Sequence, residues 1–137
     1  MTRYVAIVES EKPRQYGAWF PDVAGCVATG RSLDELVANA THALRLWAED
    51  SLESREALPA AREPEMLLGE PDVRESMSRG AVLAFIPLLV DAGRPARANI
   101  SLDAGLLQAI DAAAKARGLT RSAFLASAAR EKILAEA

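Results

Sequence analysis

The sequence has 137 residues, half of them hydrophobic and about a quarter charged, which is the composition of a folded protein rather than of a disordered tail. The net charge is -3 at pH 7, but residues 1–93 carry -6 and residues 94–137 carry +3. A single cysteine and a single histidine exclude an intrachain disulfide and a metal site built from several Cys or His residues.

No segment has the pattern of a secretory signal or a membrane span. Met1 to Arg3 lead directly into strand-like residues, without an apolar core and a cleavage site. The longest apolar run, residues 81–90, contains Pro87 and is too short to cross a bilayer. We therefore expect a cytoplasmic protein, since a reducing compartment suits one free cysteine.

Three short strands are predicted in the first thirty residues, at 4–9, 17–20 and 26–29, with Pro- and Gly-marked turns between them. Residues 20–26, with the sequence Phe-Pro-Asp-Val-Ala-Gly-Cys, predict a reversal of the chain in which Gly25 takes a positive φ. We expect Cys26 to be a small buried hydrophobe rather than a reactive thiolate.

An amphipathic helix is predicted to begin after Ser32. Residues 32–35, Ser-Leu-Asp-Glu, form a capping box, in which the Ser32 hydroxyl accepts from the Glu35 amide and the Glu35 carboxylate reaches back to the Ser32 amide. The helix is expected to continue to about residue 58, with His42 on its solvated face. Its apolar stripe consists of Leu33, Leu36, Val37, Ala40, Leu44, Trp47 and Ala48. We expect this stripe to cover the sheet over a core that includes Val5, Ile7 and Trp19.

Residues 59–79 are rich in proline and acidic side chains, and they predict an exposed connection with a short helix near 72–79. This stretch either is a solvated connection or attracts a basic protein, and the sequence leaves both open. Residues 81–86 predict a fourth strand, whose continuous apolarity predicts burial on both faces or under a partner chain.

The change in charge and the Gly and Pro residues at 91–95 predict a linker between two domains, 1–90 and 96–137. In the second domain, polar and apolar side chains alternate over residues 97–102, as they do along a strand with one exposed face. The polar face carries Arg97, Asn99 and Ser101, and the apolar face carries Ala98, Ile100 and Leu102. The segment is either an ordinary edge strand or one half of a two-stranded ribbon formed by two chains, and such a ribbon fits the major groove of DNA.

Two helices are predicted behind this strand, 103–117 and 120–135, with Asp103 and Thr120 as their N-caps and Gly118 at the C′ position between them. So small a domain rarely buries enough apolar surface alone, which favours a two-fold partner. The dimer core is expected to contain Ala98, Ile100, Leu102, Leu106, Ile110 and Phe124.

Base-reading and phosphate-binding roles follow from the residue types. Arg97 and Asn99 can form paired hydrogen bonds to guanine and adenine edges, and Ser101 is adaptable. The start of the last helix, with Thr120 and Arg121, combines free amides and a positive dipole end, as a phosphate anchor does. The alternative is that Thr120 only caps the helix and Arg121 is solvated.

No catalytic constellation is found. The only histidine has no partner serine or cysteine in a nucleophile motif, and no glycine spacing makes a phosphate cradle. We therefore expect no catalytic residue, no metal and no cofactor.

The sequence resembles the HicB antitoxin family in residues 20–26, in the helix start at 32–35, in residues 44–47 (Leu-Arg-Leu-Trp) and in residues 110–125. The resemblance implies an α+β protein. Its first domain would have a partial ribonuclease H-like sheet with one covering helix and would bind a small RNA-cleaving toxin, HicA. Its second would be a ribbon-helix-helix (β-α-α) domain that dimerises, with higher oligomers possible, and represses the operon at operator DNA.

By the same resemblance, Arg97, Asn99 and Ser101 take base-reading positions, and Thr120 and Arg121 take phosphate-anchoring positions. Asp103 departs from the family, where a proline is common after the strand. The first domain lacks a nuclease's cluster of metal-binding carboxylates, so an inhibitor fits better than an enzyme. Two alternatives stay open, a ligand-sensing ribbon-helix-helix repressor without a toxin partner and an enzyme that acts on RNA.

Overall fold

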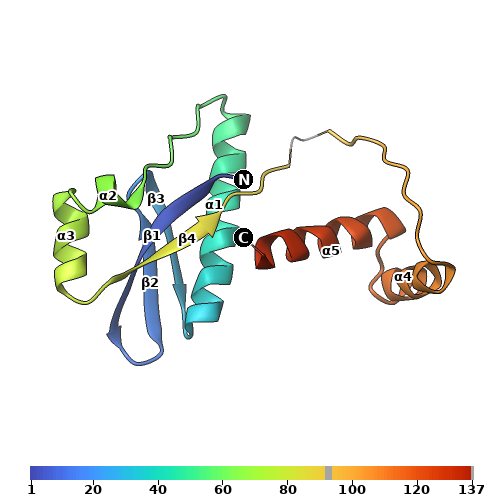
Figure 1. Ribbon diagram of the computed structural model, residues 1–137, viewed down its shortest axis with the longest axis horizontal. Helices are drawn as coiled ribbons and strands as arrows, with labels where there is room; N and C mark the ends of the chain where they lie inside the picture. The colour runs from blue at the N-terminus through green and yellow to red at the C-terminus, as the bar shows by residue number, and fades with distance from the viewer. Residues whose placement is uncertain (92–93, 137) are drawn as a thin grey trace. The chain divides into compact units, whose positions relative to one another are not determined.

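The computed structural model describes residues 1–91 and 94–136, and the chain divides into two compact units, 1–91 and 92–137 (Figure 1). Ala92 and Gly93, in the middle of the expected linker, lie outside the described residues, as does residue 137. Within the described part of the chain, no helix has both the length and the apolar character needed to span a membrane.

The first unit is built on a four-stranded antiparallel sheet with the strand order β3-β2-β1-β4. The strands are β1 (Arg3–Lys12), β2 (Gln15–Phe20), β3 (Val23–Gly30) and β4 (Val82–Pro87). This confirms the four predicted strands. The last strand pairs with the first, so the two outer strands of the sheet are β3 and β4.

The junction between β3 and helix α1 (Leu33–Glu53) depends on close backbone contact. A Cβ atom on Gly30 would lie 2.5 Å from the amide nitrogen of Leu36, so only glycine fits there. The Ser32 hydroxyl accepts from the Glu35 amide at 3.1 Å, as predicted. The reciprocal half of the capping box is wrong, because the Glu35 carboxylate accepts from the amide of Arg31 instead of Ser32.

The backbone at Gly25 agrees with the sequence prediction, whereas the end of α1 differs from it. Gly25 takes a φ of +81°, which confirms its role in the reversal at 20–26. Helix α1 ends at Glu53, five residues earlier than expected, and Arg55 just beyond it takes a φ of +58°. A residue in that left-handed region cannot continue a right-handed helix.

The predicted core placed α1 on the wrong face of the sheet. Leu36, Ala40 and Leu44 of α1 pack on the face that carries Tyr4, Ala6 and Val8 of β1. Val5, Ile7 and Trp19 lie on the opposite face, in a second cluster. Strand β1 is apolar at every position from Tyr4 to Val8, so its sequence could not tell which face the helix covers.

That opposite face is covered by α2 (Pro64–Leu67) and α3 (Pro71–Ser78), and Figure 1 shows them on the side of the sheet away from α1. Leu67 and Val73 are completely buried there against Val5 and Ile7. The expected single covering helix and the expected exposed connection over 59–79 are therefore wrong, although α3 confirms the short helix near 72–79. A strand that is apolar on both faces needs a cover on both.

Strand β4 is only partly buried. Ile86 lies in the core, but Val82 and Phe85 are 54% and 56% exposed in the single chain. Burial on both faces within this chain is therefore wrong for these two residues, which lie on an outer strand of the sheet.

The second unit contains α4 (Ala104–Ala116) and α5 (Arg121–Ala135), joined by a turn in which Gly118 takes a φ of +67°. Asp103 caps α4 by accepting from the amides of Gly105 and Leu106, which confirms the predicted cap. Ile110 and Ala114 of α4 are buried, whereas no residue of α5 is. The unit therefore has almost no core of its own.

Candidate functional site

The segment 97–102 is exposed along its whole length. In the single chain it is neither helix nor strand, so the strand predicted over these residues is not formed within one chain, which supplies no partner strand for it. Ile100 and Leu102 are 63% and 38% exposed, although they belong to the apolar half of the alternating pattern. Arg97, Asn99 and Ser101 are exposed between them. Both faces of the segment are thus available to another molecule.

The residues expected in the dimer core are mostly uncovered in one chain. Ile110 is buried, Phe124 is partly buried, and Leu106 is 51% exposed. The guanidinium of Arg117 lies 5.6 Å from the centre of the Phe124 ring, and this contact adds a cation–π interaction between the two helices. In the single chain, Leu106 is therefore exposed together with Ile100 and Leu102 of the segment 97–102.

Helix α5 begins at a well-formed cap. The Thr120 hydroxyl accepts from the amide of Ala123 at 3.1 Å, which confirms Thr120 as the N-cap. Because the first turn of a helix carries amides without intrahelical acceptors and a partial positive charge, this end of α5 attracts anions. Arg121 is the first residue of the helix and lies next to that charge.

Arg121 is held by the carboxylate of Asp111, a contact across the turn between α4 and α5 that no local sequence pattern indicates. Its Nε and Nη2 atoms donate to the two carboxylate oxygens of Asp111 in α4, each at 2.8 Å. Hydrogen bonds from Arg121 hold the pKa of Asp111 below its ordinary value. A guanidinium has five N–H groups, so three remain for a further acceptor such as a phosphate.

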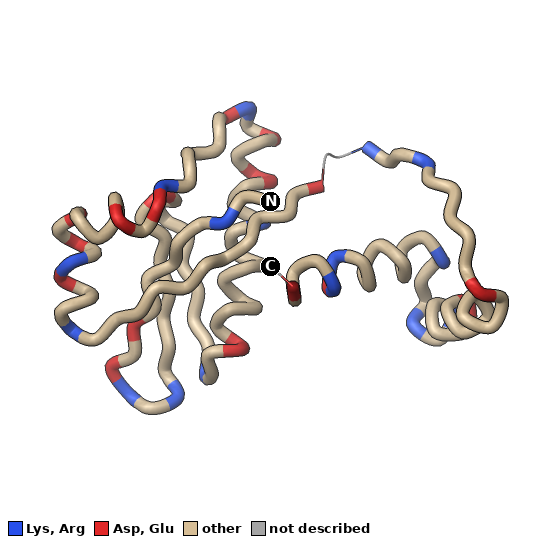
Figure 2. The backbone as a smooth tube through the Cα atoms, viewed as in Figure 1, with Lys and Arg blue, Asp and Glu red and all other residues tan. Residues whose placement is uncertain are grey.

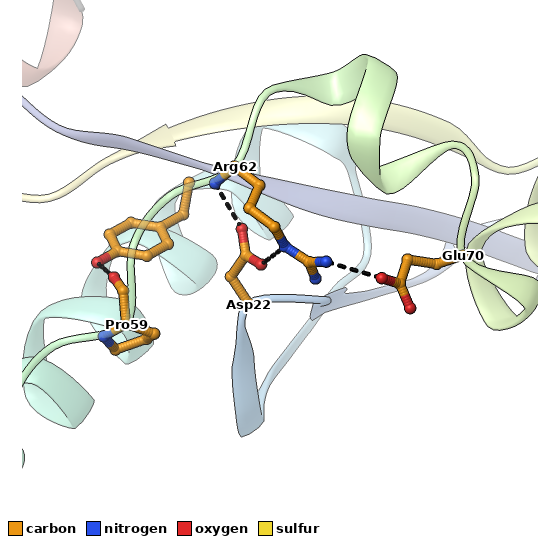
Figure 3. Close-up of polar contacts among 5 residues, drawn as sticks. Asp22, Pro59, Arg62 and Glu70 are labelled. Carbon is orange, nitrogen blue, oxygen red and sulfur yellow. Dashed lines mark hydrogen bonds and ion pairs between the residues drawn. The ribbon is translucent and has the colours of Figure 1, made fainter.

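In the first unit, the reversal at 20–26 supplies the acceptor of a polar network (Figure 3). The Asp22 carboxylate, whose side chain is only 6% exposed, accepts from the backbone amide and the guanidinium of Arg62. Arg62 also reaches Glu70 at 2.7 Å, and these hydrogen bonds raise its pKa. The network joins the residues on both sides of α2 to the β2–β3 turn.

Tyr4 forms a second long-range hydrogen bond to the segment that precedes α2. Its hydroxyl donates to the carbonyl of Pro59 at 2.6 Å, and burial, followed by the charge of Asp22, raises the pKa of Tyr4. Residues 59–70 are therefore an ordered part of the first unit. No local pattern in the sequence indicates these contacts, which join residues 40 and 55 positions apart.

The side chains considered for chemistry are not brought together. His42 is exposed on α1, and Cys26 is buried in the core, where burial raises its thiol pKa, as predicted for an unreactive cysteine. In residues 1–91 and 94–136, no group of three or more His, Cys, Asp or Glu side chains could hold a metal ion.

Comparison with known proteins agrees with this arrangement. A family model described as the HicB-like antitoxin of bacterial toxin-antitoxin systems matches residues 4–129. An uncharacterised 14.9 kDa protein of Haemophilus phage HP1 is 31% identical over 122 residues, which cover 83% of this chain and 85% of the relative.

Solved structures give the same result. The crystal structure of the Burkholderia pseudomallei antitoxin HicB is 29% identical, covers 97% of each chain and has a TM-score of 0.54. A chain of the HicA3 and HicB3 toxin-antitoxin complex is 22% identical, with 66% of this chain and 99% of that chain covered and a TM-score of 0.52, which shows similarity of fold. Since the family model matches through both units, this chain belongs to the HicB-like antitoxin family of bacterial toxin-antitoxin systems.

Proposed function

We propose that this chain neutralises an RNA-cleaving, HicA-like toxin by binding it through residues 1–90 and represses its own operon through a DNA-binding dimer of residues 96–137. The observation that carries the proposal is the family match, which runs through both units instead of stopping at the first. The protein acts by binding in the cytoplasm and needs no cofactor for either role.

The toxin-binding role is supported by the charge of the first unit. Residues 1–91 hold fifteen acidic and nine basic residues, so their net charge is negative. An RNA-cleaving toxin binds RNA and would therefore present positive charge, which is complementary to this unit. The test is to express this chain together with its upstream and downstream neighbours and to measure the mass of the purified complex. A small basic protein should co-purify in a fixed ratio, and its absence would refute the toxin-binding role.

The DNA-binding role is supported by the exposure of residues 97–102. Two copies pairing antiparallel about a two-fold axis would form one ribbon with two copies each of Arg97, Asn99 and Ser101 on a single face. Such a ribbon fits the major groove, and these residue types can bond to base edges there. A palindromic operator follows from the two-fold symmetry of the dimer.

The dimer itself is supported by the uncovered apolar residues of the second unit. Ala98, Ile100 and Leu102 would face the helices of both chains, where Leu106, Ile110 and Phe124 would complete the core. Thr120 and Arg121 would then place one phosphate anchor on each side of the ribbon. Gel-shift measurements with the DNA upstream of this reading frame test the role, and equal affinity for unrelated DNA would contradict it.

A further inference from the structure

Residues 63–75 form a surface of unusual composition, which we call the α2–α3 surface. It consists of the exposed residues Glu63, Glu65, Met66, Leu68, Asp72 and Glu75. Two of these are apolar, Met66 at 61% and Leu68 at 39% exposure, although Leu67 between them is completely buried. Helix α2 thus points one leucine into the core and leaves both neighbours in solvent.

The charge of this surface is strongly negative. Within residues 63–75 there are five acidic residues and one basic residue, Arg74, and Figure 2 shows the acidic positions along α2 and α3. Glu70 is already engaged by Arg62, but Glu63, Glu65 and Asp72 are exposed around the two apolar side chains. Exposed apolar side chains in a charged surround resemble the core and rim of a protein interface, where methionine is enriched.

The surface is also preformed. Leu67 and Val73 are buried on the sheet, and Arg62 joins the segment to Asp22 and Glu70. A surface that is ordered before binding loses little conformational entropy when a partner docks. Met66 and Leu68 are therefore held at the surface by a segment that is ordered through its buried and hydrogen-bonded neighbours.

We propose that the α2–α3 surface is the docking site for the positively charged RNA-binding face of the toxin, an inference that rests on the function proposed above. Met66 and Leu68 would be the apolar anchors of the contact, and the acidic side chains would pair with the basic residues that otherwise bind RNA phosphates. Binding there would cover the toxin's RNA site with protein, so inhibition would be competitive with RNA.

The test compares substitutions on the α2–α3 surface with matched substitutions on α1, which lies on the other face of the sheet. Glu65→Lys is matched by Asp50→Lys, and Met66→Ala by Leu46→Ala, all at exposed positions. Each full-length variant is titrated with the purified toxin from the co-expression experiment. Glu65→Lys and Met66→Ala should each raise the Kd at least tenfold, whereas the α1 variants should stay within twofold of wild type.

Salt dependence gives a second measurement. The wild-type affinity should fall as salt rises, since it includes screened charge pairs, and Glu65→Lys should flatten this dependence. Asp50→Lys should leave it unchanged. Thermal unfolding of all four variants in the absence of toxin should match wild type, because every substituted side chain is exposed.

The outcomes separate this inference from the proposed function. If wild type binds the toxin but all four variants bind equally well, the docking site is wrong and the antitoxin role stands. If wild type does not bind, the antitoxin role itself fails. If Met66→Ala lowers the mass of the toxin-free protein in solution, the surface is occupied by a second copy of this chain, which also overturns the docking site.

Discussion

Asp111 and Arg121 are joined by two hydrogen bonds of 2.8 Å, which connect the middle of α4 to the first residue of α5. This arrangement fixes the direction of a guanidinium that lies at the positive end of a helix. Arg121 is therefore oriented in the absence of DNA, which would lower the entropic cost of the phosphate contact proposed above.

Replacing Arg121 with alanine should weaken binding to operator and to unrelated DNA alike, because a phosphate contact carries no sequence information. The slope of log K against log salt concentration should decrease by about 1 for each lost phosphate contact. Binding isotherms at several salt concentrations measure this. Lys132→Ala removes the same charge from the last turn of α5 and should leave the slope unchanged; equal slopes for all three proteins would argue against the anchor.

The Asp111–Arg121 pair predicts a pH dependence of stability. Because Arg121 lowers the folded-state pKa of Asp111 from its ordinary value of 3.8, the pair stabilises the folded chain above that value. The stabilisation should be lost as the pH falls through the lowered folded-state pKa. Urea unfolding of wild type and Asp111→Asn should therefore differ at pH 7 and converge in strong acid. A difference independent of pH would show that the carboxylate charge is not responsible.

Asn99→Ala should relax sequence preference without abolishing DNA binding. Loss of a paired contact to an adenine edge costs about 1 to 3 kcal/mol at one base step. Affinities for the operator and for an operator with a single substituted base pair measure the change. The operator should lose affinity and the substituted site should not. Equal losses on operator and random DNA would contradict a base-reading role.

Ile100→Asp should make the protein monomeric if the proposed dimer forms, because the substitution places a charge in the apolar half of the proposed ribbon. Light scattering of the full-length protein gives the mass directly. Ser101→Asp, one residue away on the polar face, should keep the dimer while weakening DNA binding through its negative charge. If Ile100→Asp remains dimeric, the ribbon does not hold the two chains together.

Truncation of two adjacent residues of α2 should change the free energy of unfolding by very different amounts. Leu67→Ala removes a completely buried side chain and should lower the free energy of unfolding by about 2 to 5 kcal/mol. Met66→Ala removes an exposed one and should change it by less than about 0.5 kcal/mol. Urea unfolding measures both, and a small effect for Leu67→Ala would mean that α2 does not cover the sheet.

The local features of this chain were predictable because nearby residues determine them. The four strands, the caps at Ser32, Asp103 and Thr120, and the positive φ of Gly25 all follow from side chains within a few positions. The division of charge near residue 93 was equally visible in the composition.

The sequence predictions that were wrong share one cause: contacts between residues far apart in the chain leave no local sequence pattern. The prolines and acidic side chains of residues 59–79 predict a solvated connection. They outnumber the two apolar residues, Leu67 and Val73, that cover the second face of the sheet. Asp22 and Arg62 are 40 positions apart, and neither is unusual in its own neighbourhood. A second covering layer is needed because both faces of the sheet are apolar.

By itself, the sequence determined the four strands of the sheet, the three longest helices with their caps and the alternation of residues 97–102, because hydrogen bonding and side-chain direction depend on residues a few positions apart. Tertiary structure alone decided which face of β1 meets α1, that α2 and α3 cover the other face, and that Arg121 is held by Asp111. Those outcomes depend on which surfaces the folded chain brings together to exclude water, and burial is a property of the whole fold.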